Sequence, residues 1–323
     1  MHSKLKHGIG GAAGRSLRVA SLFALAFPMA FIATGCSLSP LAKHTAAFAT
    51  ATNQLVDNST NAYRAAETLH DNAQGYQAVA HFDSDPPYNP YKTTPLMSEK
   101  GIQVRIDLLV AIRTYAQSLA DLTGGVKSDQ LDNAAASVGT NLKAMSSTLS
   151  TDVTGSAGST GNKLVLSDSE ANGISTAAEA LGSFLASKKV KSEVPKQIKA
   201  MQPNIEALCK LLQDDIGILR KQSSLDYRTM VEDQDGFIRH NTTLTPLERR
   251  EQILVLPQLV QSQRATDTLL AQLQDSLFKF NLTYQALAAE AQGNNPVSLA
   301  SRISDLEATG ENLAKYYQSL PSK

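Results

Sequence analysis

Apolar side chains recur with helical spacing along almost the whole chain beyond residue 40. Between 41 and 80 they follow one another mostly every third position, from Val56 through Tyr76 to Val79, which is typical of the buried stripe of an amphipathic helix. Comparable stripes predict helices over 97–122, 128–149, 167–187, 190–240, 245–292 and 297–320. Strand-like alternation is nearly absent, which excludes most α/β enzyme folds. The pattern therefore predicts an all-α fold of six or seven helices, several long and antiparallel, in an elongated helical bundle.

Two of these helices carry clear end signals. Ser98 can cap the helix that follows it, and the glycine pair at 124–125 can end that helix. Thr245 and Glu248 form a capping-box pattern around Pro246, a residue that suits the first helical position. The sequence thus predicts both ends of the second helix and the start of the sixth.

The sixth helix has the most regular apolar pattern. From Leu259 to Ala291 the spacing alternates between four and three residues, which favours coiled-coil or antiparallel-bundle packing. Gln263 and Thr266 are polar interruptions of this seam. They either fix the register of the packing or face a wetter layer of the bundle.

A proline-rich segment separates the first two helices. Residues 81–95 contain four prolines, which exclude a helix and favour an extended, polyproline-like path. Tyr88 and Tyr91 project from this path. Two interpretations remain open: a stiff connection whose tyrosines pack back on the bundle, or a recognition loop that presents aromatic groups at low entropic cost.

Residues 150–163 are rich in Ser, Thr and Gly, and we expect a flexible connection there. The segment does not match a phosphate-binding loop, because Gly161 is followed by Asn162 and Lys163, which breaks the required order of glycine, lysine and hydroxyl residue. It also lacks a preceding strand.

No catalytic or metal-binding motif is apparent. The four histidines beyond residue 35 form no pair at metal-ligand spacing, and His81, Asp83 and Asp85 lack a further ligand. Asp214 and Asp215 are adjacent, so on a helix they point about 100° apart; they cannot face each other as an acid/base pair, and we expect them on a solvated face. We therefore expect no enzyme, no cofactor and no metal, although a catalytic site assembled from distant residues would leave no such pattern.

The first 35 residues have the layout of a secretory signal peptide. Four basic residues and no acidic ones precede or enter an apolar run of about 15 residues, Val19 to Ala33. This run is shorter than the roughly 20 residues that span a bilayer, and Pro28 interrupts it. The rest of the chain holds 26 basic and 30 acidic residues, so it has no positive surplus with which to bind nucleic acid.

The end of this run, Ala33-Thr34-Gly35-Cys36, resembles the lipobox of bacterial lipoprotein precursors. The resemblance covers only the first 36 residues, and Ala33 stands where leucine is usual. It implies cleavage before Cys36 and attachment of acyl chains such as palmitate to that cysteine. Ser37, in place of an aspartate, implies the outer membrane. An ordinary cleaved signal peptide with a chance cysteine is the alternative. With Cys36 acylated, Cys209 is left single, and we expect it as a small buried core residue.

These features predict a cleaved signal peptide over 1–35, a lipidated tether over 36–40 and a helical bundle domain over 41–323. The expected function is that of a lipid-anchored, periplasm-facing interaction or scaffold module of the cell envelope. Its partner would be an envelope protein or polymer, which the sequence does not identify. The alternative is a ligand-binding or sensor module with a small-molecule pocket between its helices.

Overall fold

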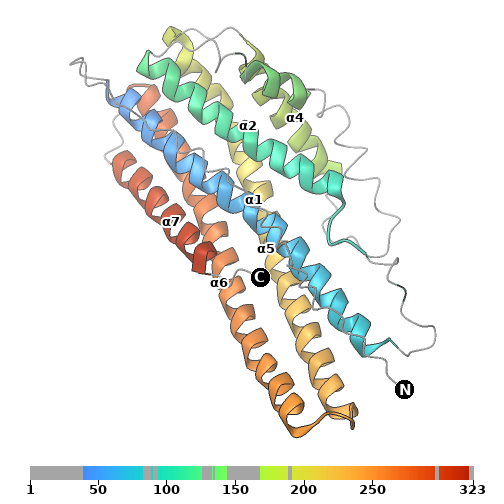
Figure 1. The fold of residues 1–323 in the computed structure, drawn as a ribbon. Helices are drawn as coiled ribbons and strands as arrows, with labels where there is room; N and C mark the ends of the chain where they lie inside the picture. Colours follow the sequence, from blue (N-terminus) through green and yellow to red (C-terminus); the bar gives the residue numbers. More distant parts are fainter. Residues whose placement is uncertain are drawn as a thin grey trace, which may run out of the picture. The chain divides into compact units, whose positions relative to one another are not determined.

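The computed structural model in Figure 1 describes residues 39–82, 89, 94–125, 133, 135–143, 168–187, 191–294 and 298–319. The chain divides into two units, Met1–Ser37 and Leu38–Lys323, and every described residue belongs to the second. Within it, the described elements are helices: α1 (Pro40–Ala80), α2 (Glu99–Gly124), α4 (Asp168–Ala186), α5 (Val194–His240), α6 (Pro246–Ala291) and α7 (Leu299–Ser319), with a short 3₁₀ turn at Lys191–Glu193. Residues 135–143 are helical as well. The described residues contain no strand, which confirms the all-α prediction.

The predicted end signals act as expected. The Ser98 hydroxyl accepts the amide hydrogen of Gly101 at 3.0 Å, and Gly125 ends α2 in the left-handed conformation, with a φ of 74°. At the start of α6 the Thr245 hydroxyl and the Glu248 side chain cap each other's backbone amides in a complete capping box. Helix α2 begins and ends, and helix α6 begins, where the local sequence satisfies the free backbone groups.

Helices α5 and α6 form a long antiparallel hairpin (Figure 1). A short turn joins them, and Arg249 of α6 closes it by donating to the carbonyls of Ile238 at 2.7 Å and Asn241 at 2.9 Å. Farther along the hairpin, Gln263 donates to the Ser224 hydroxyl at 3.0 Å, and Thr266 lies 3.2 Å from the Tyr227 hydroxyl. The polar interruptions of the seam thus form a polar layer between the two helices.

Toward the C-terminal half of α6 the residues of the same seam are buried, and most of them are aliphatic or aromatic. Phe280 stacks on Phe48 of α1 with ring centroids 5.0 Å apart. Tyr284 donates to the Ile198 carbonyl at 2.8 Å, and its hydroxyl lies 2.5 Å from that of Tyr115 on α2. Four helices therefore meet in this part of the core. Cys209 is buried there too, as the sequence predicts, and burial raises the pKa of its thiol.

A buried ion pair and a tyrosine hydroxyl connect α1, α2 and α5. Arg105 of α2 and Asp215 of α5 are almost inaccessible to solvent, and they pair through Nε–Oδ2 at 2.5 Å and Nη2–Oδ1 at 3.0 Å. Tyr63 of α1 donates to the same carboxylate at 3.1 Å. The expectation that both aspartates lie on a solvated face was wrong for Asp215, which is buried, and correct for Asp214, which forms an exposed ion pair with Lys210. The reason is the 100° offset itself, because it allows one neighbour to face inward while the other faces solvent.

Backbone contact at two glycines brings α4 against the helical residues 135–143. A Cβ added at Gly139 would lie 2.6 Å from the Gly182 carbonyl oxygen, and one added at Gly182 would lie 2.7 Å from the Gly139 oxygen. Because real Cβ atoms do not approach backbone this closely, only glycine permits the crossing.

Candidate functional site

Three sites that the sequence predicts lie outside the described residues: Cys36, the loop tyrosines Tyr88 and Tyr91, and the expected flexible connection over 150–163. The structure therefore leaves these predictions untested. It does describe the residues on which the proline-rich segment ends, and the helices that surround them.

The chain leaving the proline-rich segment is fastened to α1. Thr94 and Gln74 exchange two hydrogen bonds of 2.9 Å, between the backbone of Thr94 and the side-chain amide of Gln74. The amide of Leu96 donates to Glu67 at 3.3 Å, and Leu96 is buried in the core. One end of the segment that carries the tyrosines is thus held against the C-terminal half of α1.

His70 lies at the centre of this attachment. Its Nδ1 is 3.1 Å from Oδ1 of Asp226 on α5, and its Nε2 is 3.0 Å from the Thr94 carbonyl oxygen. Both neighbours are acceptors, and only the protonated imidazole donates from both nitrogens. The hydrogen bond to Asp226 accordingly raises the pKa of His70, against the effect of burial. Burial, followed by repulsion from Asp71, raises the pKa of the neighbouring Glu67.

The N-terminal half of α6 exposes an apolar surface. Residues 253–260 read ILVLPQLV, yet none of them is buried. Leu247 is 63% exposed, Ile253 47% and Leu254 51%. We call this surface the α6 outer face; its exposed members are Leu247, Arg250, Ile253, Leu254, Pro257, Gln261 and Arg264. A helix that is apolar on nearly all sides normally packs against neighbours on more than one side. Here the hydrogen bonds of Gln252, Gln263 and Thr266 place α5 against one side of α6, whereas the residues of the α6 outer face are exposed.

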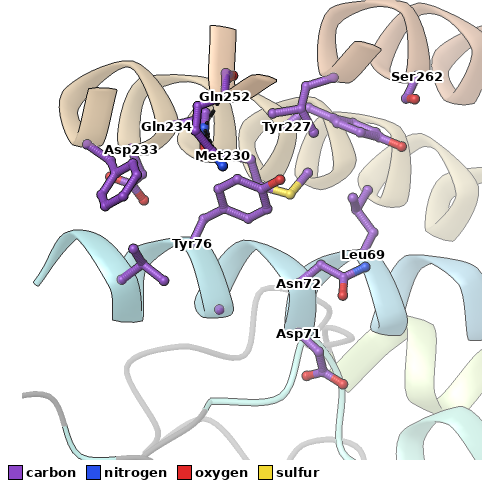
Figure 2. A pocket seen from close by; sticks show the side chains of 14 residues that line it. Leu69, Asp71, Asn72, Tyr76, Tyr227, Met230, Asp233, Gln234, Gln252 and Ser262 are labelled. Atoms are coloured by element: carbon purple, nitrogen blue, oxygen red, sulfur yellow. Dashed lines mark hydrogen bonds between the residues drawn. The ribbon is translucent and has the colours of Figure 1, made fainter. Parts of the chain in front are cut away.

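A groove of about 680 Å³ lies between the C-terminal half of α1 and the α5–α6 hairpin (Figure 2). Tyr76 projects from α1 toward Met230 and Gln234 of α5, and Gln252 and Ser262 of α6 lie on the same side of the groove as these α5 residues. Its described lining residues are Leu69, Asp71, Asn72, Gly75, Tyr76, Val79, Tyr227, Met230, Asp233, Gln234, Phe237, Gln252, Leu259 and Ser262. We refer to it below as the α1–hairpin groove.

Eight of the fourteen described lining residues are apolar or aromatic, and six carry polar side chains. Gln234 donates to the Gln252 side chain at 2.8 Å, so the two amides are occupied with each other. Asp233 differs, because its Oδ2 is buried and accepts no hydrogen bond from the described residues. Burial raises the pKa of this carboxyl, while the nearby imidazole of His81 opposes the rise.

The sequence did not predict this groove. Tyr76 and Val79 continue the apolar stripe of α1, so both were expected to face the core, but Tyr76 is half-buried and Val79 is 60% exposed. Burial ends here because the described contacts of α1 with α7 and α2 lie in earlier turns, for example at Asn58 and Asp57, whereas its last turns lie beside the hairpin and the residues around Thr94. The apolar stripe was the available signal, but the missing neighbour depends on tertiary structure.

Among the described residues, no group of three or more His, Cys, Asp or Glu side chains could hold a metal ion, and no helix is long and apolar enough to cross a membrane. No protein-family model matches the chain, and no curated protein or solved structure is significantly similar to it.

Proposed function

We propose that the protein is a lipid-anchored, periplasm-facing helical module of the cell envelope, which binds an envelope protein or polymer. The observation that carries the interaction role is the α6 outer face. Three large aliphatic side chains, Leu247, Ile253 and Leu254, stand exposed on one helix. Each is already about half-buried, so complete burial by a partner would gain roughly half of the 1.5–3 kcal/mol that burying a fully exposed side chain gives. The three together make the face a natural docking surface.

The charges around this surface favour a defined partner over nonspecific association. Arg250 and Arg264 flank the aliphatic residues and are exposed. Neither forms an ion pair in the described structure. Exposed guanidinium groups at the rim of an apolar patch add orientation and specificity to an interface. We therefore expect acidic groups on the partner beside its apolar contact.

The anchor is proposed from the resemblance at Cys36. Several acyl chains on this cysteine would hold the protein stably, because each buried methylene contributes about 0.8 kcal/mol of membrane affinity. Metabolic labelling with radioactive palmitate tests the proposal: the wild-type chain should incorporate label, and Cys36→Ala should not. Absence of label from the wild type would refute the anchor. Density fractionation of the labelled membranes then tests the expected outer-membrane location that rests on Ser37.

The interaction role has a separate test. Residues 38–323, used as bait in envelope extract, should retain a partner, and Leu254→Asp should release it because a carboxylate cannot be buried in an apolar contact. A Tyr88→Ala/Tyr91→Ala variant tests the recognition-loop interpretation in the same experiment. Asp305→Asn on α7, an exposed substitution elsewhere in the unit, is the control. If Leu254→Asp retains the same partner as the wild type, the docking role of the α6 outer face is wrong.

A second candidate function is ligand binding between helices, and the α1–hairpin groove is the specific observation that favours it. Its volume of about 680 Å³ lies within the range of about 300–1,000 Å³ that is usual for small-molecule sites, and its lining, in which apolar and aromatic residues outnumber polar ones, matches their usual composition. Thermal-shift screening would test it, because a ligand that binds the native state alone raises the melting temperature.

A further inference from the structure

We propose that the α1–hairpin groove binds a small organic cation with an apolar body, such as an aromatic or alkyl ammonium compound. The inference rests on the second candidate function above and gives its ligand a chemical class. It depends on neither the lipid anchor nor the α6 outer face. Three observations support it: the charge of the lining, the aromatic walls and the state of Asp233.

The charge of the groove has one sign. Among its described lining residues, Asp71 and Asp233 are the only charged ones, and none is Lys, Arg or His. Asp71 points away from the α5 side chains in Figure 2, so Asp233 is the carboxylate on the hairpin wall. An anionic ligand would meet repulsion and find no cationic partner among the described lining residues; His81, which acts on Asp233, is not one of them. A cation would meet a favourable field in a partly desolvated site, where charges interact more strongly than in water.

The walls suit such a cation. Tyr76 of α1 and Tyr227 and Phe237 of α5 contribute aromatic rings, and Met230 contributes a polarisable thioether. The negative face of an aromatic ring attracts ammonium groups, and the gain grows when the site excludes water. Leu69, Val79 and Leu259 complete a lining that can receive the apolar body of the ligand.

The carboxylate of Asp233 can accept a positively charged partner. One of its carboxylate oxygens is buried and accepts no hydrogen bond from the described residues, which is costly for a group of this kind. The imidazole of His81 is the nearby basic group that acts on Asp233, and Arg228 is paired with Glu232 at 3.7 Å. A bound ammonium group would compensate the charge of Asp233 while its apolar part covers Tyr76 and Met230.

The test compares three compounds of nearly equal shape: phenylethylammonium, neutral 2-phenylethanol and anionic phenylpropionate. Isothermal titration calorimetry would measure their binding to the full chain in zwitterionic lipid nanodiscs, with empty nanodiscs as the blank. We expect the cation to bind about tenfold more tightly than the alcohol, and the anion to bind least. This comparison uses the wild-type protein alone, so it holds even where a variant fails to fold.

Two variants place the site. Asp233→Asn should reduce the preference for the cation over the alcohol to about onefold to twofold, and Tyr76→Ala should weaken both compounds. Asp305→Asn on α7 should change neither. Equal affinity of the wild type for cation and alcohol, or an unchanged preference in Asp233→Asn, would overturn the cationic class while leaving the groove a ligand site. Failure of all three compounds to bind would overturn the proposal and count against the second candidate function, whereas the docking role of the α6 outer face would be unaffected.

Discussion

Removal of one partner from the Arg105–Asp215 pair should destabilise the protein severely, while replacement of both partners should cost much less. Arg105→Met leaves the Asp215 carboxylate almost fully buried, with the Tyr63 hydroxyl at 3.1 Å as the one remaining donor among the described residues. Asp215→Leu leaves the guanidinium buried, with the Gly101 carbonyl at 3.1 Å as its remaining acceptor in the described part of the chain. Each substitution thus creates an uncompensated buried charge.

The expected magnitudes follow from this geometry. Charge centres about 4 Å apart attract each other by about 4 kcal/mol at an effective dielectric constant of about 20. Breaking a buried pair from one side costs about 3–5 kcal/mol. We therefore expect each single variant to lose about that much unfolding free energy, and the double variant Arg105→Met/Asp215→Leu to recover most of it, because two apolar side chains need no counter-charge.

Urea unfolding followed by far-ultraviolet circular dichroism measures these losses, with the free energies compared in a double-mutant cycle. Asp214→Asn is the matched control on the neighbouring position. Its ion pair with Lys210 is exposed on both sides, so the change should stay within about 0.5 kcal/mol. Single variants that lose under about 1 kcal/mol, or losses that simply add in the double variant, would refute the assigned role of the pair.

Three further predictions concern other parts of the bundle. The pKa of His70 is raised in the folded protein, so its contribution to stability is complete below its unfolded pKa of about 6.5 and is lost as the pH rises through the folded pKa. The unfolding free energy of the wild type should therefore fall over this range more steeply than that of His70→Gln. Parallel pH profiles of the two proteins would contradict this. Gly182→Ala should destabilise by at least about 1–3 kcal/mol because its Cβ meets backbone, whereas Gly173→Ala on the same helix, with open space around its Cβ, should stabilise by about 0.4–1 kcal/mol; equal melting temperatures for the two variants would show that the close contact is not limiting. Thr245→Ala should cost about 1 kcal/mol in urea unfolding by removing the cap of α6, and Thr243→Ala, outside the cap, serves as the control; the same loss in both would count against the cap.

The helices and their ends could be predicted from the sequence because the signals are local. The cap of α2 at Ser98 and the capping box of α6 lie within a few residues of the backbone groups that they satisfy. The regular seam of α6 likewise predicted packing against a neighbour, and its polar members contact α5. The signal for each cap lies within one helical turn, and that for the seam repeats every two turns, although the seam residues themselves contact a helix 39 positions away.

The buried charge and the groove could not be predicted in this way. Asp215 is compensated by Arg105, which lies 110 positions earlier in the chain, and nothing in either local sequence indicates the other. The groove exists because the last turns of α1 continue past the helices that cover its earlier turns, so Tyr76 and Val79 keep a core-like spacing without a complete set of neighbours. Both features depend on which helices pack together, and the apolar spacing of a single helix does not contain that information.

The most direct test of the proposed function is photo-crosslinking in intact cells from position 254 on the α6 outer face. A photoreactive amino acid there, in a chain with Cys36 intact, should form a crosslink to one envelope component. The same amino acid at position 305, on the exposed surface of α7, should form none above background. A specific crosslink from 254 would establish the α6 outer face as a docking surface. Equal background from both positions would contradict the account of this protein as an envelope interaction module.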